Sequence, residues 1–224
     1  MLAFRVIDQG HPPQMTDLAR PDPGPGQIRV KIAACGLNFA DLLMIKGTYQ
    51  DTPPLPFTLG MEVSGTVDAL GKGVTGLALG ARVAAFAGQG GLAEYGVFDA
   101  NRAVTIPDTM PFDVAAGFLV AYGSSHLALT HRAKLQAGER LLVLGAAGGV
   151  GLTAVELGAI MGAEVIAVAR GAEKLAVAQA AGARHLIDSG TGDIRASVKA
   201  LGGADVVYDA VGGASFDAAL RATR

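Results

Sequence analysis

Short segments in which apolar and polar residues alternate occupy the first half of the chain. The clearest is 27–33, where three apolar residues alternate with Arg29 and Lys31, and such alternation indicates a strand with one buried face. Turns rich in glycine and proline separate these segments, the stiffest of them at 21–26. Further strands are predicted at 1–7, 15–19, 61–70, 81–86, 92–98 and 102–106, with a short helix at 38–46 and a loop at 47–56. Short strands with frequent turns predict a small barrel-like, all-β unit through about residue 108.

The pattern changes after this unit. Thr109 is a candidate helix cap with Pro111 in the first turn, and the alanine-rich stretch 112–134 has a helical pattern. Beyond Gly138, apolar runs alternate with helix-like segments. The strands are predicted at 141–144, 164–169, 185–187 and 205–208, and the helices at 150–161, 172–181, 192–200 and from about 215. This alternation predicts a parallel sheet with right-handed crossovers. We therefore expect an all-β domain at 1–118 and an α/β domain at 119–224.

A glycine-rich turn lies between the first strand and the first helix of the α/β domain. The segment 141–151 reads LLVLGAAGGVG, which is the strand, turn and helix context of a dinucleotide-binding site. Gly148 allows the backbone to approach a pyrophosphate, and Gly151 allows the helix to pack closely on the strand. The segment departs from the usual G-x-G-x-x-G because Ala146 holds the first glycine position. The N–H groups at the helix start would bind the phosphate, so Ala147, Gly148, Gly149 and Val150 are predicted cofactor contacts.

The end of the next strand bears on which dinucleotide is bound. NAD-binding turns usually have an acidic residue about 20 residues after the glycines, which accepts a hydrogen bond from the ribose 2′-hydroxyl. Here the strand 164–169 is followed by Arg170 and Gly171, and Lys174 comes shortly after. Because cations suit a 2′-phosphate, the sequence favours NADPH over NADH.

Composition and charge narrow the function classes. Eighteen basic and 20 acidic residues give a net charge of −2, which argues against nucleic acid as a main partner. The single cysteine excludes an internal disulfide and a cysteine-based zinc cluster. No segment has the pattern of a signal peptide or the length of a membrane span. We therefore expect a cytoplasmic protein.

Several stretches, spread over the whole chain in one order, resemble the quinone oxidoreductase (zeta-crystallin-like) branch of the zinc-independent medium-chain dehydrogenase/reductase superfamily. They are 35–41 (CGLNFAD), 47–49 (GTY), 54–65 (PLPFTLGMEVSG), 146–151 (AAGGVG), 173–175 (EKL) and 207–213 (VYDAVGG). The resemblance implies a GroES-like β-barrel catalytic domain followed by a Rossmann doubly wound parallel sheet. It also implies that cofactor and substrate bind in a cleft between the two domains.

The resemblance assigns roles to individual residues. Asn38 corresponds to an asparagine near the nicotinamide and the substrate, and Tyr49 to a tyrosine that could bond a substrate carbonyl or donate a proton. Ser124 keeps the hydroxyl of a family threonine and could contact the carboxamide. Toward the cofactor, Lys174 corresponds to a 2′-phosphate lysine and Val211 is expected against the nicotinamide ribose. A further predicted contact near the adenosine is Ser189, which stands where several members have a tyrosine.

Zinc alcohol dehydrogenases of the same superfamily are the nearest alternative. They have a cysteine at the position of Asn38 and a histidine at the position of Met61, and neither residue found here is a good zinc ligand. Cys35 lies three residues before the ligand position and is expected to be a small, partly buried thiol. The four histidines form no cluster in the sequence. No metal site is therefore predicted.

The implied reaction is hydride transfer from NADPH to a quinone or to the β-carbon of an enone, and single-electron transfer to a quinone stays open. Without zinc, hydrogen-bond donors must stabilise the negative charge on the acceptor oxygen. A non-catalytic NADPH-binding protein is the competing class. A sheet in the order 3-2-1-4-5-6 would lack its last two strands here, so we expect a truncated chain whose parent enzyme is a homodimer.

Overall fold

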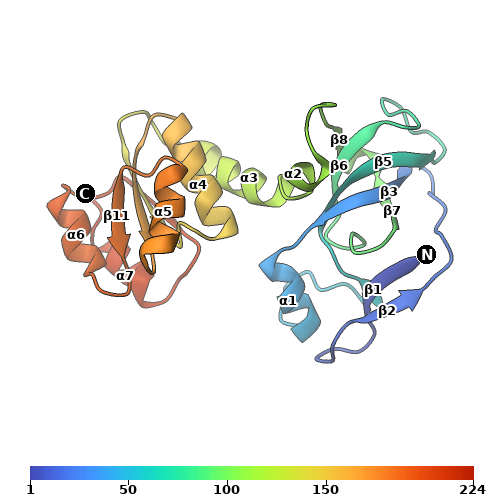
Figure 1. The fold of residues 1–224 in the computed structure, drawn as a ribbon, viewed down its shortest axis with the longest axis horizontal. Helices are drawn as coiled ribbons and strands as arrows, with labels where there is room; N and C mark the ends of the chain where they lie inside the picture. Colours follow the sequence, from blue (N-terminus) through green and yellow to red (C-terminus); the bar gives the residue numbers. More distant parts are fainter. The chain divides into compact units, whose positions relative to one another are not determined.

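The computed structural model describes residues 1–224. The chain divides into two compact units, Met1–Val120 and Ala121–Arg224, and each is described by itself (Figure 1).

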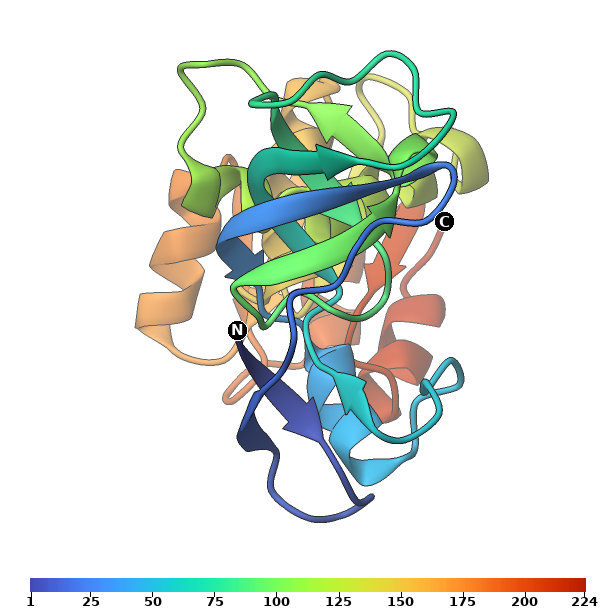
Figure 2. The ribbon, with the colours of Figure 1, turned by 90° about the vertical axis from the view of Figure 1, so that its right-hand side faces the viewer.

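The first unit is built on a five-stranded antiparallel sheet in the order β7-β3-β5-β6-β8 (Figure 2). Its strands are β3 (Gln27–Gly36), β5 (Glu62–Leu70), β6 (Arg82–Phe86), β7 (Tyr95–Asp99) and β8 (Ala103–Thr105), the last preceded by the 3₁₀ turn η1 (Ala100–Arg102). The alternation predicted for β3 is confirmed, since Ile28 and Val30 are fully buried against Val63 and Phe98.

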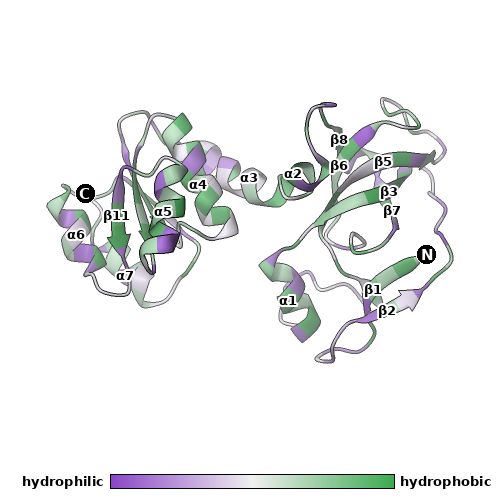
Figure 3. Ribbon diagram, viewed as in Figure 1, coloured by the Kyte–Doolittle hydropathy of each residue, from purple (hydrophilic) through white to green (hydrophobic).

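A smaller sheet and one helix complete this unit. Strands β1 (Leu2–Val6), β2 (Gln14–Asp17) and β4 (Phe57–Thr58) form an antiparallel sheet in the order β2-β1-β4. Edge strand β2 is more polar than β1, which carries buried residues (Figure 3). Helix α1 (Phe39–Lys46) packs on this sheet through Met44, against Val6 and Leu59. The two-residue strand β4 was not predicted, because it is too short to show a period.

The second unit is a parallel sheet in the order β11-β10-β9-β12. Its elements are α3 (Leu119–His126, whose first residues belong to the first unit), the π-helical segment η2 (Leu127–Arg132), β9 (Arg140–Leu144), α4 (Gly149–Ile160), β10 (Glu164–Ala169), α5 (Ala172–Ala180), β11 (His185–Asp188), α6 (Ile194–Ala200), β12 (Val206–Asp209) and α7 (Ala214–Leu220). This order confirms the predicted Rossmann-type sheet.

Helices cover both faces of this sheet. Leu141 and Val143 of β9 point to one face and pack with α4 and α5, whereas Leu142 and Leu144 point to the other and pack with α6 and α7. Because both faces are buried, the four residues 141–144 of β9 are all apolar instead of alternating with polar ones.

The helix predicted over 112–134 is wrong as one continuous element. Helix α2 (Phe112–Ala116) begins after Pro111, which is its N-cap in place of Thr109, and ends at Gly117. Helix α3 then starts anew, and the N–H of Val120 in its first turn donates to the buried carboxylate of Glu62 at 2.9 Å. Glycine is a poor helix residue, and a distant carboxylate stabilises the second start, so the break depends on tertiary structure.

Candidate functional site

The glycine-rich turn after β9 is close-packed. Gly145 has a φ of +70°, and a Cβ added at Gly151 would lie 2.1 Å from the carbonyl oxygen of Gly145. Ala146, at the first glycine position of the usual pattern, is fully buried, and its N–H donates to the carbonyl oxygen of Val168 at 3.0 Å. Its methyl group therefore fits into the core, and the departure from the glycine pattern leaves the turn intact.

The start of α4 presents backbone donors. Gly148 is the N-cap and has no side chain to bond them, and the first helical bond is donated by Leu152 to Gly148 at 2.8 Å. The N–H groups of Gly149 and Val150 therefore have no acceptor within the helix. Gly148 and Gly149 are exposed, so an anion can approach these donors.

Val211 lies beside this turn. The carboxylate of Asp209, at the end of β12, accepts the N–H groups of Val211 at 2.8 Å and Gly212 at 2.9 Å. The resulting turn places a methyl carbon of Val211 2.9 Å from where a Cβ of Gly145 would stand, with the side chain 60% exposed. The structure thus brings Val211 next to the predicted phosphate-binding turn.

Arg170, Lys174 and Ser189 lie at the carboxyl ends of β10 and β11. The parallel register pairs Ala169 with Asp188, and the N–H of Ser189 donates to the carbonyl oxygen of Ala169 at 3.0 Å. All three predicted side chains are exposed, and neither cation forms a hydrogen bond or an ion pair within the chain.

The sequence reasoning missed Asp188 at this edge. No acidic residue stands directly at the end of β10 in the sequence, but the fold brings the carboxylate of Asp188 there from β11. Hydrogen bonds from the backbone N–H groups of Gly190 and Gly171, and then the charge of Arg170, lower the pKa of Asp188. The signal that could have found it is an acidic residue at the end of the adjacent parallel strand.

Ser124, the predicted carboxamide contact on α3, is exposed, whereas its neighbour Ser125 is fully buried. The hydroxyl of Ser125 donates to the carbonyl oxygen of Val150 at 2.8 Å and lies within hydrogen-bond distance of the hydroxyls of Thr153 and Tyr208. This cluster joins α3, α4 and β12, the elements that carry or precede Ser124, Val150 and Val211. Sequence reasoning missed it because a buried serine has no local pattern.

A second contact joins α3 to α4. The phenol of Tyr122 donates a hydrogen bond to the carboxylate of Glu156, and this bond raises the pKa of Tyr122.

In the first unit, Asn38 is the N-cap of α1. Its side-chain N–H₂ donates to the carboxylate of Glu62 at 3.0 Å. An ionised carboxylate only accepts hydrogen bonds, so the amide nitrogen must face Glu62. The Asn38 side chain and the carboxylate of Asp41 also form the capping box at the start of α1.

Two buried carboxylates surround Asn38. Asp41 accepts the N–H of Asn38 at 2.9 Å and that of Gly60 at 3.0 Å, while Glu62 accepts the Asn38 amide and the N–H of Val120. Each carboxylate is therefore satisfied by N–H donors. No group of three or more His, Cys, Asp or Glu side chains is arranged to hold a metal ion.

Cys35 is enclosed by backbone beside these carboxylates. A Cβ added at Gly60 or Gly91 would approach its sulfur to 2.6 or 2.8 Å. Burial, with the nearby negative charges of Asp41 and Glu62, raises the pKa of the thiol to about 12. The thiol is therefore protonated at neutral pH, which does not suit a metal ligand or a nucleophile.

Tyr49 follows the C-terminal end of α1. It is half-buried, and its ring packs against the cluster that contains Met44 and Phe57. Its carbonyl oxygen accepts the hydroxyl of Thr52 at 2.6 Å, but its phenol oxygen takes part in no hydrogen bond within the chain. Asn38 and Tyr49 thus lie at opposite ends of one short helix.

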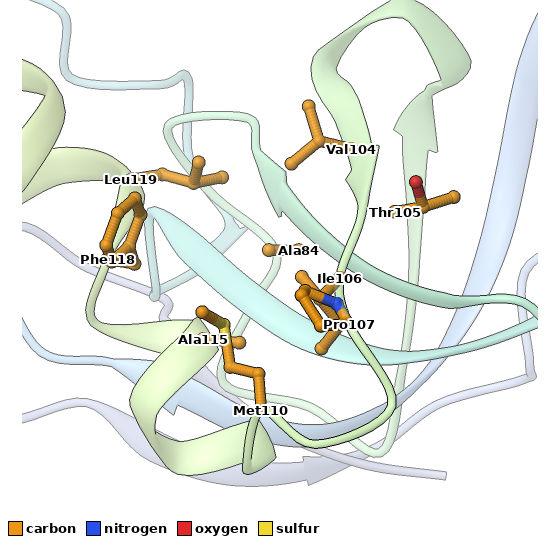
Figure 4. Close-up of a pocket in the computed structure, with 9 residues that line it drawn as sticks. All are labelled: Ala84, Val104, Thr105, Ile106, Pro107, Met110, Ala115, Phe118 and Leu119. Carbon is orange, nitrogen blue, oxygen red and sulfur yellow. The ribbon is translucent and has the colours of Figure 1, made fainter.

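An apolar pocket of about 190 Å³ lies elsewhere in this unit (Figure 4). Strand β6, the end of β8 and the segment from α2 to the start of α3 form its walls. Its lining residues are Ala84, Val104, Thr105, Ile106, Pro107, Met110, Ala115, Phe118 and Leu119. Neither Asn38 nor Tyr49 lines it, so it is separate from the predicted catalytic side chains.

Comparison with protein families matches each unit to a model. Residues 24–108 match the alcohol dehydrogenase GroES-like domain, and residues 149–224 match the zinc-binding dehydrogenase domain. No helix has both the length and the apolar character needed to span a membrane.

Individual relatives agree with these matches. A quinone oxidoreductase-like protein 2 homolog from Nematostella vectensis is 42% identical over 203 residues, which cover 88% of this chain and 55% of the relative. A mycobacterial protein solved in complex with NADPH is 33% identical with a TM-score of 0.93, covering 100% of this chain and 71% of that one. The quinone oxidoreductase from Thermus thermophilus, also solved with NADPH, is 35% identical with a TM-score of 0.89, and the match covers 100% of this chain and 70% of that one. The chain thus spans just over half the length of the curated relative.

Proposed function

Because the chain belongs to the quinone oxidoreductase branch of the medium-chain dehydrogenase/reductase superfamily, we propose that it acts as an NADPH-dependent oxidoreductase. We propose that its acceptor is a quinone or an α,β-unsaturated carbonyl compound, reduced without zinc. The observation that carries the cofactor assignment is that two exposed cations, Arg170 and Lys174, lie at the strand edge next to the phosphate-binding turn.

The second unit fits a phosphorylated dinucleotide. The free N–H groups of Gly149 and Val150, with the turn at Ala147 and Gly148, would hold the pyrophosphate. Arg170 and Lys174 would hold the 2′-phosphate beside Ser189, and Val211 and Ser124 would lie toward the nicotinamide half. Two solved relatives with NADPH bound support this assignment. When bound, the reduced nicotinamide supplies the hydride.

The residues around Asn38 support chemistry without zinc. Asn38 and Met61 replace the cysteine and histidine of the zinc enzymes, and N–H donors already satisfy the carboxylates of Asp41 and Glu62. Glu62 and the capping box of α1 together hold the Asn38 side chain in one orientation.

Tyr49 would support reduction of a carbonyl-containing acceptor. Reduction leaves negative charge on the carbonyl oxygen, and a phenol can donate a hydrogen bond or a proton to it. The phenol of Tyr49 is free within the chain, and its ring is held by packing. A donor that is pre-positioned in this way stabilises the developing charge without reorganisation.

The test is a titration of the chain with NADPH and, separately, NADH, followed by the fluorescence of the reduced nicotinamide. We expect NADPH to bind more tightly, and we expect the double variant R170A/K174A to lose most of that preference while still binding NADH. An unchanged preference in the double variant would overturn the assignment of the two cations. A chain that binds neither nucleotide would overturn the proposed cofactor.

A further inference from the structure

One carboxylate oxygen joins two turns at the edge where Arg170 lies. Oδ1 of Asp188 accepts the N–H of Gly171 at 3.1 Å and the N–H of Gly190 at 2.8 Å. Gly171 follows Arg170 and is the N-cap of α5, the helix that carries Lys174. Gly190 follows Ser189 in the turn after β11. The turn that carries Ser189 and the turn that carries Arg170 and begins the helix of Lys174 are therefore bonded to a single atom.

Packing around Gly190 links the same turn to Arg170. A Cβ added at Gly190 would lie 3.1 Å from Oδ1 of Asp188 and 3.5 Å from Cγ of Arg170. The backbone of this turn therefore lies against both the carboxylate and the aliphatic part of the arginine. A change in the turn after β11 would move the base of the Arg170 side chain.

We propose that Asp188 is a positioning residue for recognition of the 2′-phosphate of NADPH. It holds the turn after β10 against the turn after β11, so that Arg170 and Lys174 are presented together to a phosphate monoester. This inference rests on the proposed function, because it specifies how the same cofactor site selects NADPH.

The geometry and the charge of Asp188 are expected to have opposite effects on NADPH binding. The pKa of Asp188 is lowered by the N–H groups of Gly190 and Gly171 and by the charge of Arg170, so the group is ionised at neutral pH. A carboxylate repels a phosphate, so its charge alone would weaken NADPH binding. An asparagine keeps an acceptor oxygen without the charge. Asp188→Asn and Asp188→Ala therefore separate the two effects.

The experiment measures the dissociation constants of NADPH and NADH for the unmodified chain and for each variant. We expect Asp188→Ala to weaken NADPH binding by about tenfold, the effect of losing hydrogen bonds to a charged acceptor. NADH binding should change by less than about threefold. Asp188→Asn should keep the NADPH affinity or increase it, because the turns stay joined and the repulsion is removed.

Asp193 offers a matched control. Its carboxylate also accepts a backbone N–H, that of Ala196 at 3.0 Å, but it caps α6 and does not bond the turn that carries Arg170. Asp193→Ala should lower the thermal stability and leave the ratio of the two dissociation constants unchanged. Gly190→Ala is a second test that keeps Asp188, and it should weaken NADPH binding more than NADH binding.

Three results would contradict the inference. The first is a folded Asp188→Ala variant with an unchanged NADPH to NADH ratio. The second is an Asp188→Asn variant that loses as much NADPH affinity as Asp188→Ala, because the residue would then act through its charge. If Asp188→Ala does not fold, an unchanged ratio in Gly190→Ala overturns the inference. If the unmodified chain binds neither nucleotide, the proposed function itself fails, and this outcome is distinct from a failure of the role given to Asp188 alone.

Discussion

The hydroxyl oxygen of Ser125 lies 3.1 Å from the phenol oxygen of Tyr208. Ser125 is on α3 and Tyr208 is on β12, and the same serine hydroxyl donates to Val150 in the first turn of α4. A tyrosine hydroxyl that donates to Ser125 leaves the serine proton for the carbonyl of Val150, so the two bonds are compatible. This contact connects three elements around the glycine-rich turn.

Ser125→Ala should destabilise the second unit. Removing the hydroxyl leaves the Val150 carbonyl and the Tyr208 phenol without this partner, at a cost of about 1–3 kcal/mol in the free energy of unfolding. Urea unfolding followed by circular dichroism measures the change. Tyr208→Phe is the milder comparison, since it keeps the ring and removes one bond, and we expect a smaller loss. Equal stability of the alanine variant and the unmodified chain would contradict the structural role of this hydroxyl.

Gly151→Ala should impair folding of the second unit. The added methyl group would meet the carbonyl oxygen of Gly145 at 2.1 Å. Because that oxygen belongs to the backbone and a Cβ is fixed to the helix backbone, α4 must move away from the turn after β9. We expect a loss of about 1–3 kcal/mol, typical of overpacking, together with weaker NADPH binding.

Gly123→Ala is the matched control for this substitution. Gly123 lies in α3 and has no atom within 4 Å of its added Cβ, so alanine should keep or raise the stability through its better helix propensity. If both alanine variants have the same thermal midpoint, the close approach of Gly151 to Gly145 does not determine the stability of the second unit.

Tyr49→Phe should reduce turnover and leave NADPH binding unchanged. Phenylalanine keeps the ring that packs against Met44 and Phe57 but removes the proton donor, and loss of such a donor typically lowers the rate by about 100-fold or more. The measurement is steady-state oxidation of NADPH with a panel of quinones and enones. Tyr95→Phe, on β7, is the matched tyrosine control and should retain the full rate. Unchanged turnover in Tyr49→Phe would exclude the donor role.

Acid should weaken the second unit through Glu164. The hydrogen bond from His185 at 2.6 Å, and then the charges of Arg184 and Arg140, lower the pKa of Glu164 from its ordinary value of 4.5. A carboxylate whose pKa is lowered by folding contributes stability above its unfolded pKa, and that contribution is lost as the pH falls through the folded pKa. Stability should therefore decline below pH 4.5.

Glu164→Gln tests this dependence, because glutamine cannot titrate. The variant should be less stable at neutral pH, and its stability should fall less steeply with acid below pH 4.5 than that of the unmodified chain. Thermal midpoints across this range measure both slopes. Identical slopes would show that other groups account for the acid dependence.

The sequence alone predicted the elements whose signal is local. The alternation of β3, the apolar run of β9 and the glycines after it depend on neighbours along the chain, and each was found where it was expected. The parallel sheet also followed from the alternation of strands and helices, and its order was the one expected for a Rossmann doubly wound sheet.

Contacts between residues distant in sequence could only come from the tertiary structure. Glu62 stabilises the start of α3 at Val120 and orients the amide of Asn38. Asp188 reaches the end of β10 because parallel strands align their carboxyl ends. Local patterns report which residues form a strand or a helix, whereas a buried polar partner is chosen by whichever donor or acceptor the packed fold brings within hydrogen-bond distance.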